Sequence, residues 1–315
     1  MTKNLALTVA GGIAVLLATA GCTSASTSDS STSSGSSTQS SSASSGSTSA
    51  TGAVDAAAAA QVPTEIKSKG TLTFVHDASY PPFESFGADN KTIVGFDVDL
   101  ADALATTLGL KAAHVNAGFD TILAGISSKK YDVGMSAFSI TPERAKTVDF
   151  VTYLDGGSGI AVLKGNPKNL SMDPTKLCGH PIGAENGSTQ GLNMLPAISA
   201  QCQKDGKAAI NVQLYPTQSA ANLALTSNRV DAVMADTVSL GVQAKLSKGA
   251  FELAPGPDYQ PAPTGLALLK GSGLDQPLST AMKSITDSGE MQKLMAKWDI
   301  PDSALNKSIV GQIVK

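Results

Sequence analysis

Residues 71–137 decide the fold, because five patterned runs follow one another in this stretch: TLTFVH at 71–76, DVDLADALATTL at 97–108, KAAHVN at 111–116, FDTILAGISSK at 119–129 and YDVGMSA at 131–137. The first, third and fifth runs have the length and composition of strands. In the second run, Leu100, Leu104 and Leu108 recur at helical spacing. This alternation of strand and helix predicts an α/β layer architecture with a largely parallel sheet.

The same pattern repeats further along the chain. We expect strands at 160–163, 181–184, 209–215, 230–235 and 264–270, and helices at 188–200, 219–227, 238–246, 274–288 and 290–298. The strands at 160–163 and 266–269 would cross between two α/β units, so that the chain returns to the first unit at its end. The expected lobe 1 comprises residues 62–157 together with 263–315, and the expected lobe 2 comprises residues 158–262.

The N-terminus has the features of an exported lipoprotein. Lys3 precedes an apolar run that ends near residue 19 and is too short to span a bilayer, which predicts a signal peptide at residues 1–21. Small residues precede Cys22, as in the bacterial lipobox, whose cysteine is lipidated and becomes the mature N-terminus. The alternative is an ordinary secretory signal that is cleaved near residue 21 and leaves Cys22 free.

Residues 22–61 are expected to form the lipidated cysteine and a disordered tether. Of the 30 residues at 23–52, 16 are Ser and 6 are Thr, and Asp29 is the only charged one. Such a segment buries too little apolar surface to offset its ordering entropy. Residues 53–60 could add a helical turn. A lipid anchor followed by a tether suits a domain on the outer face of the bacterial cell membrane.

The composition of the chain limits which classes of partner and cofactor are expected. Lys and Arg total 23 and Asp and Glu total 26, so the chain lacks the excess of cations that nucleic-acid binding needs. With Cys22 lipidated, Cys178 and Cys202 remain and would form a disulfide in an oxidising compartment, two buried free thiols being the alternative. The three His are scattered and no CxxC motif occurs, so we expect no zinc and no other cofactor.

Polar and aromatic side chains gather where the predicted strands end. In open α/β sheets, ligands bind beyond the carboxyl ends of the strands. The side chains placed there by the sequence include a cation, carboxylates, hydroxyls and rings: Asp77, Tyr80, Phe119, Ser139, Arg144, Thr189 and Asp236. A guanidinium with hydroxyl donors suits a carboxylate, and a carboxylate suits an ammonium, so this set is complementary to an α-amino acid.

Each of these residues also has a purely structural interpretation. Arg144 could be a surface charge on a helix, although only two of the 23 cationic residues are Arg. Asp77 and Asp236 could cap helices, Thr189 could be an N-cap, and the aromatic rings could belong to the core. The joint placement at four strand ends favours a binding site.

The motifs DASYPPFE at 77–84, VGFDVDL at 94–100 and SITPER at 139–144 resemble those of the family 3 extracellular solute-binding proteins, the polar amino-acid receptors of ABC importers. GSTQ at 187–190 and RVDAV at 229–233 continue the resemblance, which covers roughly residues 62–300. It implies a two-lobed, periplasmic-binding-protein-like (Venus flytrap) fold with two hinge strands.

The resemblance also implies roles for the two ends of an amino-acid ligand. Arg144, Ser139 and Thr189 would hold its carboxylate. Asp236, with the backbone of Ala137, would hold its α-amino group.

The ligand side chain would meet a second set of residues. The ring of Phe119 or Tyr80 would cover the ligand side chain. Asp77 stands at a position where members of the family often have a residue that recognises this side chain. An Asp at this position favours a cationic or amide side chain. Phe138 is bulkier than the residue usual in the family and is expected to narrow the pocket.

The leading hypothesis is a monomeric, lipid-anchored receptor that captures a free amino acid and presents it to the permease subunits of an ABC transporter. No Walker motif is present, so ATP hydrolysis would belong to a partner. The alternative is a lyase or dehydratase on the same scaffold, although no nucleophile–base pair is evident. A sensory receptor domain is a third hypothesis, for which no signalling segment is recognisable.

Overall fold

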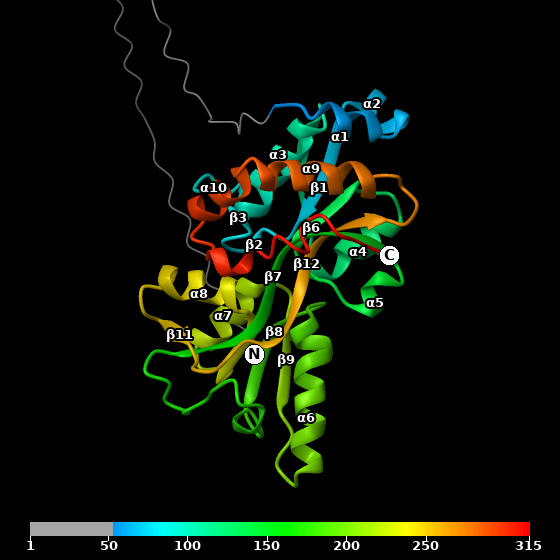
Figure 1. Ribbon diagram of the computed structural model, residues 1–315. Coiled ribbons are helices and arrows are strands. Elements are labelled where there is room, and N and C mark those ends of the chain that lie inside the picture. The colour runs from blue at the N-terminus through cyan, green and yellow to red at the C-terminus, as the bar shows by residue number, and fades with distance from the viewer. Residues whose placement is uncertain (1–52) are drawn as a thin grey trace, which may run out of the picture. The chain divides into compact units, whose positions relative to one another are not determined.

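The computed structural model describes residues 53–315 (Figure 1). The predicted signal peptide at 1–21, Cys22 and residues 23–52 of the predicted tether lie outside the described residues. Within residues 53–315, no helix combines the length and the apolar character needed to cross a membrane.

One large sheet has the strand order β5-β1-β6-β12-β7-β10-β8-β9. A first parallel block consists of β5 (Lys111–Asn116), β1 (Thr71–His76) and β6 (Val133–Ser139). A second parallel block consists of β10 (Ala232–Asp236), β8 (Pro181–Glu185) and β9 (Asn211–Tyr215). The predicted α/β architecture with largely parallel pairing is therefore confirmed within each block.

Helices accompany the sheet in two sets. The set that precedes β7 or follows β12 in the chain comprises α1 (Ala56–Gln61), α2 (Thr64–Lys69), α3 (Phe96–Thr107), α4 (Phe119–Ser127), α5 (Pro142–Ala145), α9 (Asp275–Asp287) and α10 (Glu290–Lys297). The set between these two strands comprises α6 (Leu195–Lys204), α7 (Gln218–Thr226) and α8 (Thr237–Leu246). In the first set, Leu100 and Leu104 of α3 and Met282 of α9 are fully buried in the same core as Phe74 of β1.

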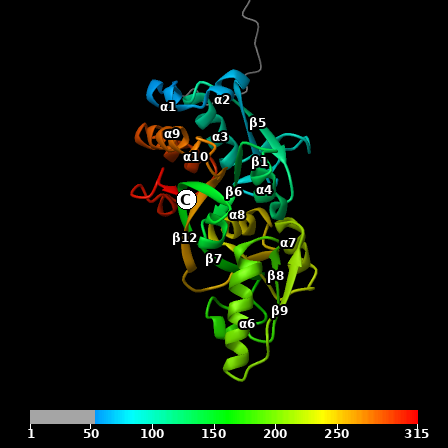
Figure 2. The same ribbon diagram turned by 90° about the vertical axis from the view of Figure 1, so that its right-hand side faces the viewer.

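Two long strands join the blocks. β7 (Val148–Leu163) and β12 (Tyr259–Leu269) pair antiparallel with each other, and each pairs with one block. Figures 1 and 2 show both strands passing between the two sets of elements. They contain the predicted crossing segments 160–163 and 266–269, and the predicted lobe boundaries at 157/158 and 262/263 fall inside them.

The five runs that decided the fold form β1, α3, β5, α4 and β6, with ends that differ by no more than two residues from the prediction. Gly109 follows the C-cap of α3 with φ +70, a left-handed conformation that ends the helix. The predicted helix at 188–200 differs, because it starts as a π-helical segment, η2 (Gln190–Met194), before α6.

The predicted tether was too long at its C-terminal end. Residues 56–61 form α1, in which Ala58 is fully buried and which packs on α9. The Asp55 side chain caps this helix by accepting from the N–H groups of Ala57 and Ala58 at 2.9 and 3.1 Å. The Asp55 N–H also donates to the Thr107 carbonyl of α3 at 2.9 Å. The folded part therefore begins several residues before position 62.

Short elements were not predicted. They are the helix α2, a three-stranded sheet of β2 (Ser79–Tyr80), β3 (Glu84–Phe86) and β4 (Ile93–Val94), the strands β11 (Phe251–Leu253) and β13 (Ile313–Val314), and the 3-10 turns η1 (Pro174–Lys176) and η3 (Asp302–Ala304). β11 and β13 both pair with β7, so the C-terminal segment is attached to the strand that joins the blocks.

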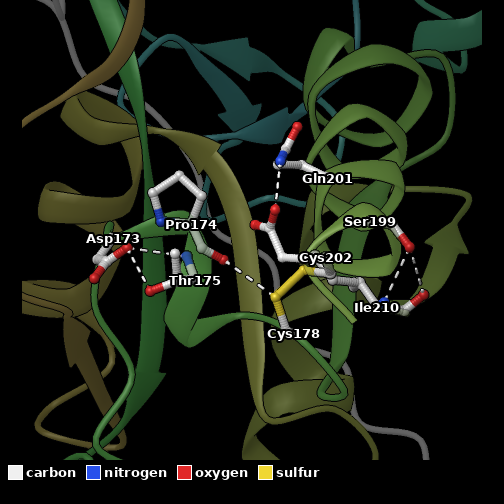
Figure 3. The surroundings of a disulfide bond; sticks show 9 residues. Asp173, Pro174, Thr175, Cys178, Ser199, Gln201, Cys202 and Ile210 are labelled. Carbon is white, nitrogen blue, oxygen red and sulfur yellow. Dashed lines mark hydrogen bonds between the residues drawn. A yellow bond between two sulfur atoms is a disulfide. The ribbon is translucent and has the colours of Figure 1, made fainter. Parts of the chain in front are cut away.

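Cys178 and Cys202 form the predicted disulfide, with their Cα atoms 5.6 Å apart. Figure 3 shows the bond, which ties the segment after η1 to α6. Neither cysteine lines the cavity described below. It closes a sequence separation of 24 residues. On the chain-entropy account, such a loop contributes about 3 kcal/mol to stability.

Candidate functional site

A cavity lies where β6, β8 and β10 end. It is narrow, with a cavity volume of about 20 Å³. Its lining residues come from both sides of the crossing strands: Tyr80, Phe119, Ser136, Ala137, Ser139, Arg144, Glu185, Ser188, Thr189, Gln190, Gln218, Met234, Ala235 and Asp236. Most of the predicted ligand-binding residues are in this set, whereas Asp77 and Phe138 are not.

Arg144 is oriented by two carbonyl groups and two rings. Its Nη1 donates to the Ser139 carbonyl at 2.9 Å and its Nη2 to the Gly187 carbonyl at 3.0 Å. The guanidinium lies 5.5 Å from the ring centre of Phe119 and 5.2 Å from that of Phe138. Burial lowers the pKa of Arg144 to about 10, so it remains cationic at neutral pH. Because a guanidinium has five N–H groups, donors remain for a ligand carboxylate.

Asp236 provides the opposite charge. Its Oδ2 accepts from the Tyr80 hydroxyl at 2.8 Å and its Oδ1 from Gln190 Nε2 at 3.0 Å. Burial raises the pKa of Asp236 to about 6, against the opposing effects of these two hydrogen bonds and the charge of Arg144. Asp236 occupies the N-cap position of α8 but makes no capping hydrogen bond, so the capping interpretation does not account for its side chain.

Glu185 is a second carboxyl group in the cavity lining. It is the last residue of β8, it is buried, and its Oε1 accepts from the backbone N–H of Gln218 at 2.9 Å. Burial, followed by the charge of Asp77, raises the pKa of Glu185 to about 8. At neutral pH the cavity lining therefore holds a largely protonated carboxyl group, Glu185, and an ionised one, Asp236.

The turn after β8 supplies hydroxyl groups. Thr189 stands at the N-cap position of η2 without capping it. Ser188 provides the local cap instead, because its Oγ accepts from the Gly191 N–H at 3.0 Å and donates to the Glu185 carbonyl at 2.7 Å. Thr189 thus occupies the predicted N-cap position without acting as a cap. Its hydroxyl donates to Gln190 Oε1 at 3.3 Å, and the residue lines the cavity.

Asp77 and Phe138 lie behind the lining. The Asp77 Oδ2 accepts from the Phe119 N–H, at the start of α4, at 2.8 Å. Phe138 is 1% exposed and stacks on Phe119 with ring centres 4.7 Å apart. Both residues therefore support Phe119, and the expected narrowing of the pocket by Phe138 is not seen in the lining.

Hydrogen bonds link the two sides of the cavity. Besides the Arg144 and Tyr80 contacts, Asn186 Nδ2 donates to Asp120 Oδ2 at 2.7 Å. Gly187 has φ +83, and a Cβ atom there would lie 2.8 Å from the Asp120 Cα. Glycine is thus required where this turn approaches Asp120.

The histidines lie outside the cavity lining. His76 contacts the Met135 carbonyl at 2.6 Å and His114 at 3.0 Å, while His180 contacts Asp231 at 2.8 Å. Among residues 53–315, no group of three or more His, Cys, Asp or Glu side chains is arranged to hold a metal ion.

Sequence reasoning missed several lining residues, of which Glu185 carries the most chemistry. Its signal was a carboxylate at the end of the otherwise apolar strand PIGAE. Ser136 and Gln190 also stood in the strand-end segments. Gln218 had no such signal, because it begins α7 and reaches the cavity through folding alone.

Comparisons with known proteins agree with this architecture. Residues 72–300 match the bacterial extracellular solute-binding proteins, family 3. The arginine-binding protein ArgT of Corynebacterium glutamicum is 29% identical over 253 residues, which are 80% of this chain and 82% of that protein. ABC transporter arginine-binding protein 1 of Escherichia coli is 31% identical over 231 residues, which are 72% of this chain and 90% of that protein.

The solved structure of an ancestral arginine-binding protein bound to arginine has a TM-score of 0.65 and 31% identity, covering 73% of this chain and 98% of that one. This likeness confirms the two-lobed, periplasmic-binding-protein-like fold. Together with the family match over most of the described residues, it supports one conclusion. The chain belongs to the bacterial extracellular solute-binding proteins, family 3.

Proposed function

We propose that this protein is the substrate-binding component of an ABC importer and that it captures a free polar amino acid with a cationic or amide side chain. The observation that carries the proposal is that Arg144 and Asp236, of opposite charge, line one cavity. The two arginine-binding relatives support the same class of ligand.

The α-carboxylate would bind at Arg144. The guanidinium is already fixed by two carbonyl groups, so little conformational freedom is lost when the ligand arrives. The hydroxyls of Ser139 and Thr189 line the same cavity and would complete the set of donors.

The α-ammonium would bind at Asp236. Tyr80 and Gln190 already donate to this carboxylate and hold it in place. An ammonium would supply the cation that a buried carboxylate needs, and would lower its raised pKa. Ala137 would contribute its carbonyl group as a further acceptor for the ammonium. Its N–H donates to the Asp97 carboxylate at 3.0 Å.

Glu185, rather than Asp77, would read the ligand side chain. Glu185 lines the cavity, whereas the Asp77 carboxylate accepts from the Phe119 backbone behind it. An ionised Glu185 would pair with a guanidinium or ammonium, and a protonated one would donate to an amide oxygen. The ring of Phe119 would cover the aliphatic stem.

Ligand capture would be coupled to closure of the two lobes. The contacts from Tyr80 to Asp236 and from Arg144 to Gly187 already join the two sides. A ligand held by Arg144 on one side and Asp236 on the other would favour the closed state through its differential contacts. We further propose that the protein is a monomer, that a lipid on Cys22 anchors it to the membrane, and that it delivers the ligand to the permease subunits.

The test is a thermal-shift screen of the free amino acids and related amines with the purified chain. A ligand present at a hundredfold excess over its Kd should stabilise the protein by about 2.7 kcal/mol. We expect arginine, lysine, ornithine or glutamine to give the largest shift, and the ligand to be recovered unchanged. A chemically altered ligand would favour the lyase or dehydratase alternative, and the absence of any shift would contradict the proposal.

A further inference from the structure

Two carboxyl groups are completely buried beneath the first side of the cavity. Glu84, at the start of β3, and Asp97, in the first turn of α3, are both 0% exposed. Neither residue lines the cavity. Buried acids of this kind are rare unless a partner or a proton compensates for the lost hydration.

Each carboxyl group accepts a hydrogen bond from a residue that lines the cavity. The Ser136 hydroxyl donates to Glu84 Oε1 at 2.7 Å and accepts from the Asp77 N–H at 3.1 Å. Asp97 Oδ2 accepts from the Ala137 N–H at 3.0 Å. It also accepts from the Tyr153 hydroxyl of β7 at 3.0 Å. The network thus connects the end of β6 to the strand that crosses between the blocks.

The remaining two oxygens have no hydrogen-bond donor. Glu84 Oε2 and Asp97 Oδ1 are buried without a hydrogen-bond partner among residues 53–315. The backbone brings the two residues together, because the Asp97 N–H donates to the Phe83 carbonyl at 2.9 Å, and each carboxyl group influences the pKa of the other. Because a carboxylate only accepts, a hydrogen bond between them requires one proton.

The surroundings indicate which group carries that proton. Asp97 accepts two hydrogen bonds and lies at the N-terminus of a 12-residue helix, where negative charge is favoured. The charged groups that act on Glu84 are Asp97 and Asp77, and Tyr153 is the titratable group that faces the pair from β7. Burial and the charge of Asp97 raise the pKa of Glu84 well above its usual range.

We propose that Glu84 and Asp97 form an acid–carboxylate pair that shares one proton and positions Ser136 and Ala137 for the ligand. The role in binding rests on the proposed function, whereas the shared proton does not. Ala137 has φ +46, a conformation that an L-residue adopts only when its surroundings hold it. The hydrogen bond from its N–H to Asp97 provides that constraint.

The first test concerns the proton alone and needs no ligand. Protein labelled with ¹³C at the glutamate carboxyl carbons should show, at pH 7, a fully protonated carboxyl signal that disappears in Glu84→Gln. Glu185 should give a separate signal that titrates near pH 8 and disappears in Glu185→Gln. An ionised Glu84 at pH 7 would overturn the proposal.

The second test concerns positioning, with L-arginine as the probe and calorimetry as the readout. Glu84→Ala leaves Asp97 Oδ1 without a partner and the Ser136 hydroxyl without an acceptor, and should weaken arginine binding about tenfold. Glu84→Gln restores an acceptor for Ser136 and a donor for Asp97, and should recover most of this loss. The exposed Glu65→Gln is the matched control and should bind as the wild type does.

Two outcomes would contradict the positioning role: Glu84→Ala binding arginine as tightly as the wild type, or Glu84→Gln being as weak as Glu84→Ala when both are folded by circular dichroism. The pH profile gives a further readout. As the pH rises into the alkaline range, the wild type should lose affinity faster than Glu84→Gln, because only the wild type acquires two buried charges. Equal profiles would count against the pair. If the wild type does not bind arginine at all, the proposed ligand fails while the carboxyl signal still tests the shared proton.

Discussion

Binding of arginine should release a proton from Glu185. Its pKa of about 8 arises mainly from burial and from the charge of Asp77. At pH 7 a group with this pKa carries about 0.9 proton. A guanidinium beside the carboxylate would lower the pKa of Glu185 well below 7, so that about 0.9 proton leaves on binding. Glutamine carries no charge on its side chain and should leave the proton in place.

The same numbers give the cost of removing the carboxylate. A buried cation–carboxylate pair contributes about 3 kcal/mol to binding. Deprotonating Glu185 at pH 7 costs about 1.4 kcal/mol, which is subtracted from the contribution of this pair to the binding free energy. We therefore expect Glu185→Gln to weaken arginine binding by roughly 1.6 kcal/mol at pH 7, or about fifteenfold. The loss should grow towards pH 8.5, because the wild type then needs no deprotonation.

The assay is titration calorimetry at pH 7 in buffers that differ in ionisation enthalpy, which gives the number of protons exchanged. Arginine should release about 1.0 proton in the wild type, about 0.9 from Glu185 and about 0.1 from Asp236, whose pKa is about 6. Glu185→Gln should release only the share of about 0.1 from Asp236. A proton number near zero for arginine, or the same number for arginine and glutamine, would refute the assignment of Glu185 to the ligand side chain.

Four other predictions concern the site, the anchor, the disulfide and the pH dependence of stability. Arg144→Ala should weaken ligand binding by about 3 kcal/mol and Arg144→Lys by less, measured by calorimetry, because Lys lacks the planar fork. Membrane fractionation should retain the wild type, whereas Cys22→Ala should release it or block its maturation, and an unlipidated wild type by intact mass would contradict the anchor. Cys178→Ser should lower the free energy of unfolding by about 3 kcal/mol while calorimetry shows unchanged binding. Burial raises the pKa of Asp236 to about 6 and of Glu185 to about 8, so the folded state binds protons more tightly than the unfolded state. The free energy of unfolding of the ligand-free protein, measured in urea, should therefore fall as the pH rises from about 4.5 to 8. It should fall less in Glu185→Gln.

The parts of the fold that could be predicted are those with a clear hydrophobic period. The strands and helices of residues 71–137 carry that period, and so do most elements of the second block. β7 was predicted only at residues 160–163, because Gly156, Gly157 and Gly159 interrupt its pattern. Its continuity depends on pairing with β12 and β10, which is information outside the local sequence.

The site was predictable to the extent that strand ends define it. That rule placed Tyr80, Arg144 and Asp236 around one cavity, but it does not fix the direction of each side chain. Asp77 points to the backbone of Phe119 for this reason, although it directly follows β1. The Glu84–Asp97 pair could not be predicted from the sequence, because each carboxylate taken alone resembles a charge on the surface or at a helix terminus.

A crystal structure of the protein with L-arginine tests the proposed binding mode most directly. We expect the ligand carboxylate to contact the guanidinium of Arg144, its α-ammonium to contact Asp236, and its guanidinium to pair with Glu185. Arginine bound outside this cavity, or bound with its carboxylate directed away from Arg144, would show that the proposed mode is wrong.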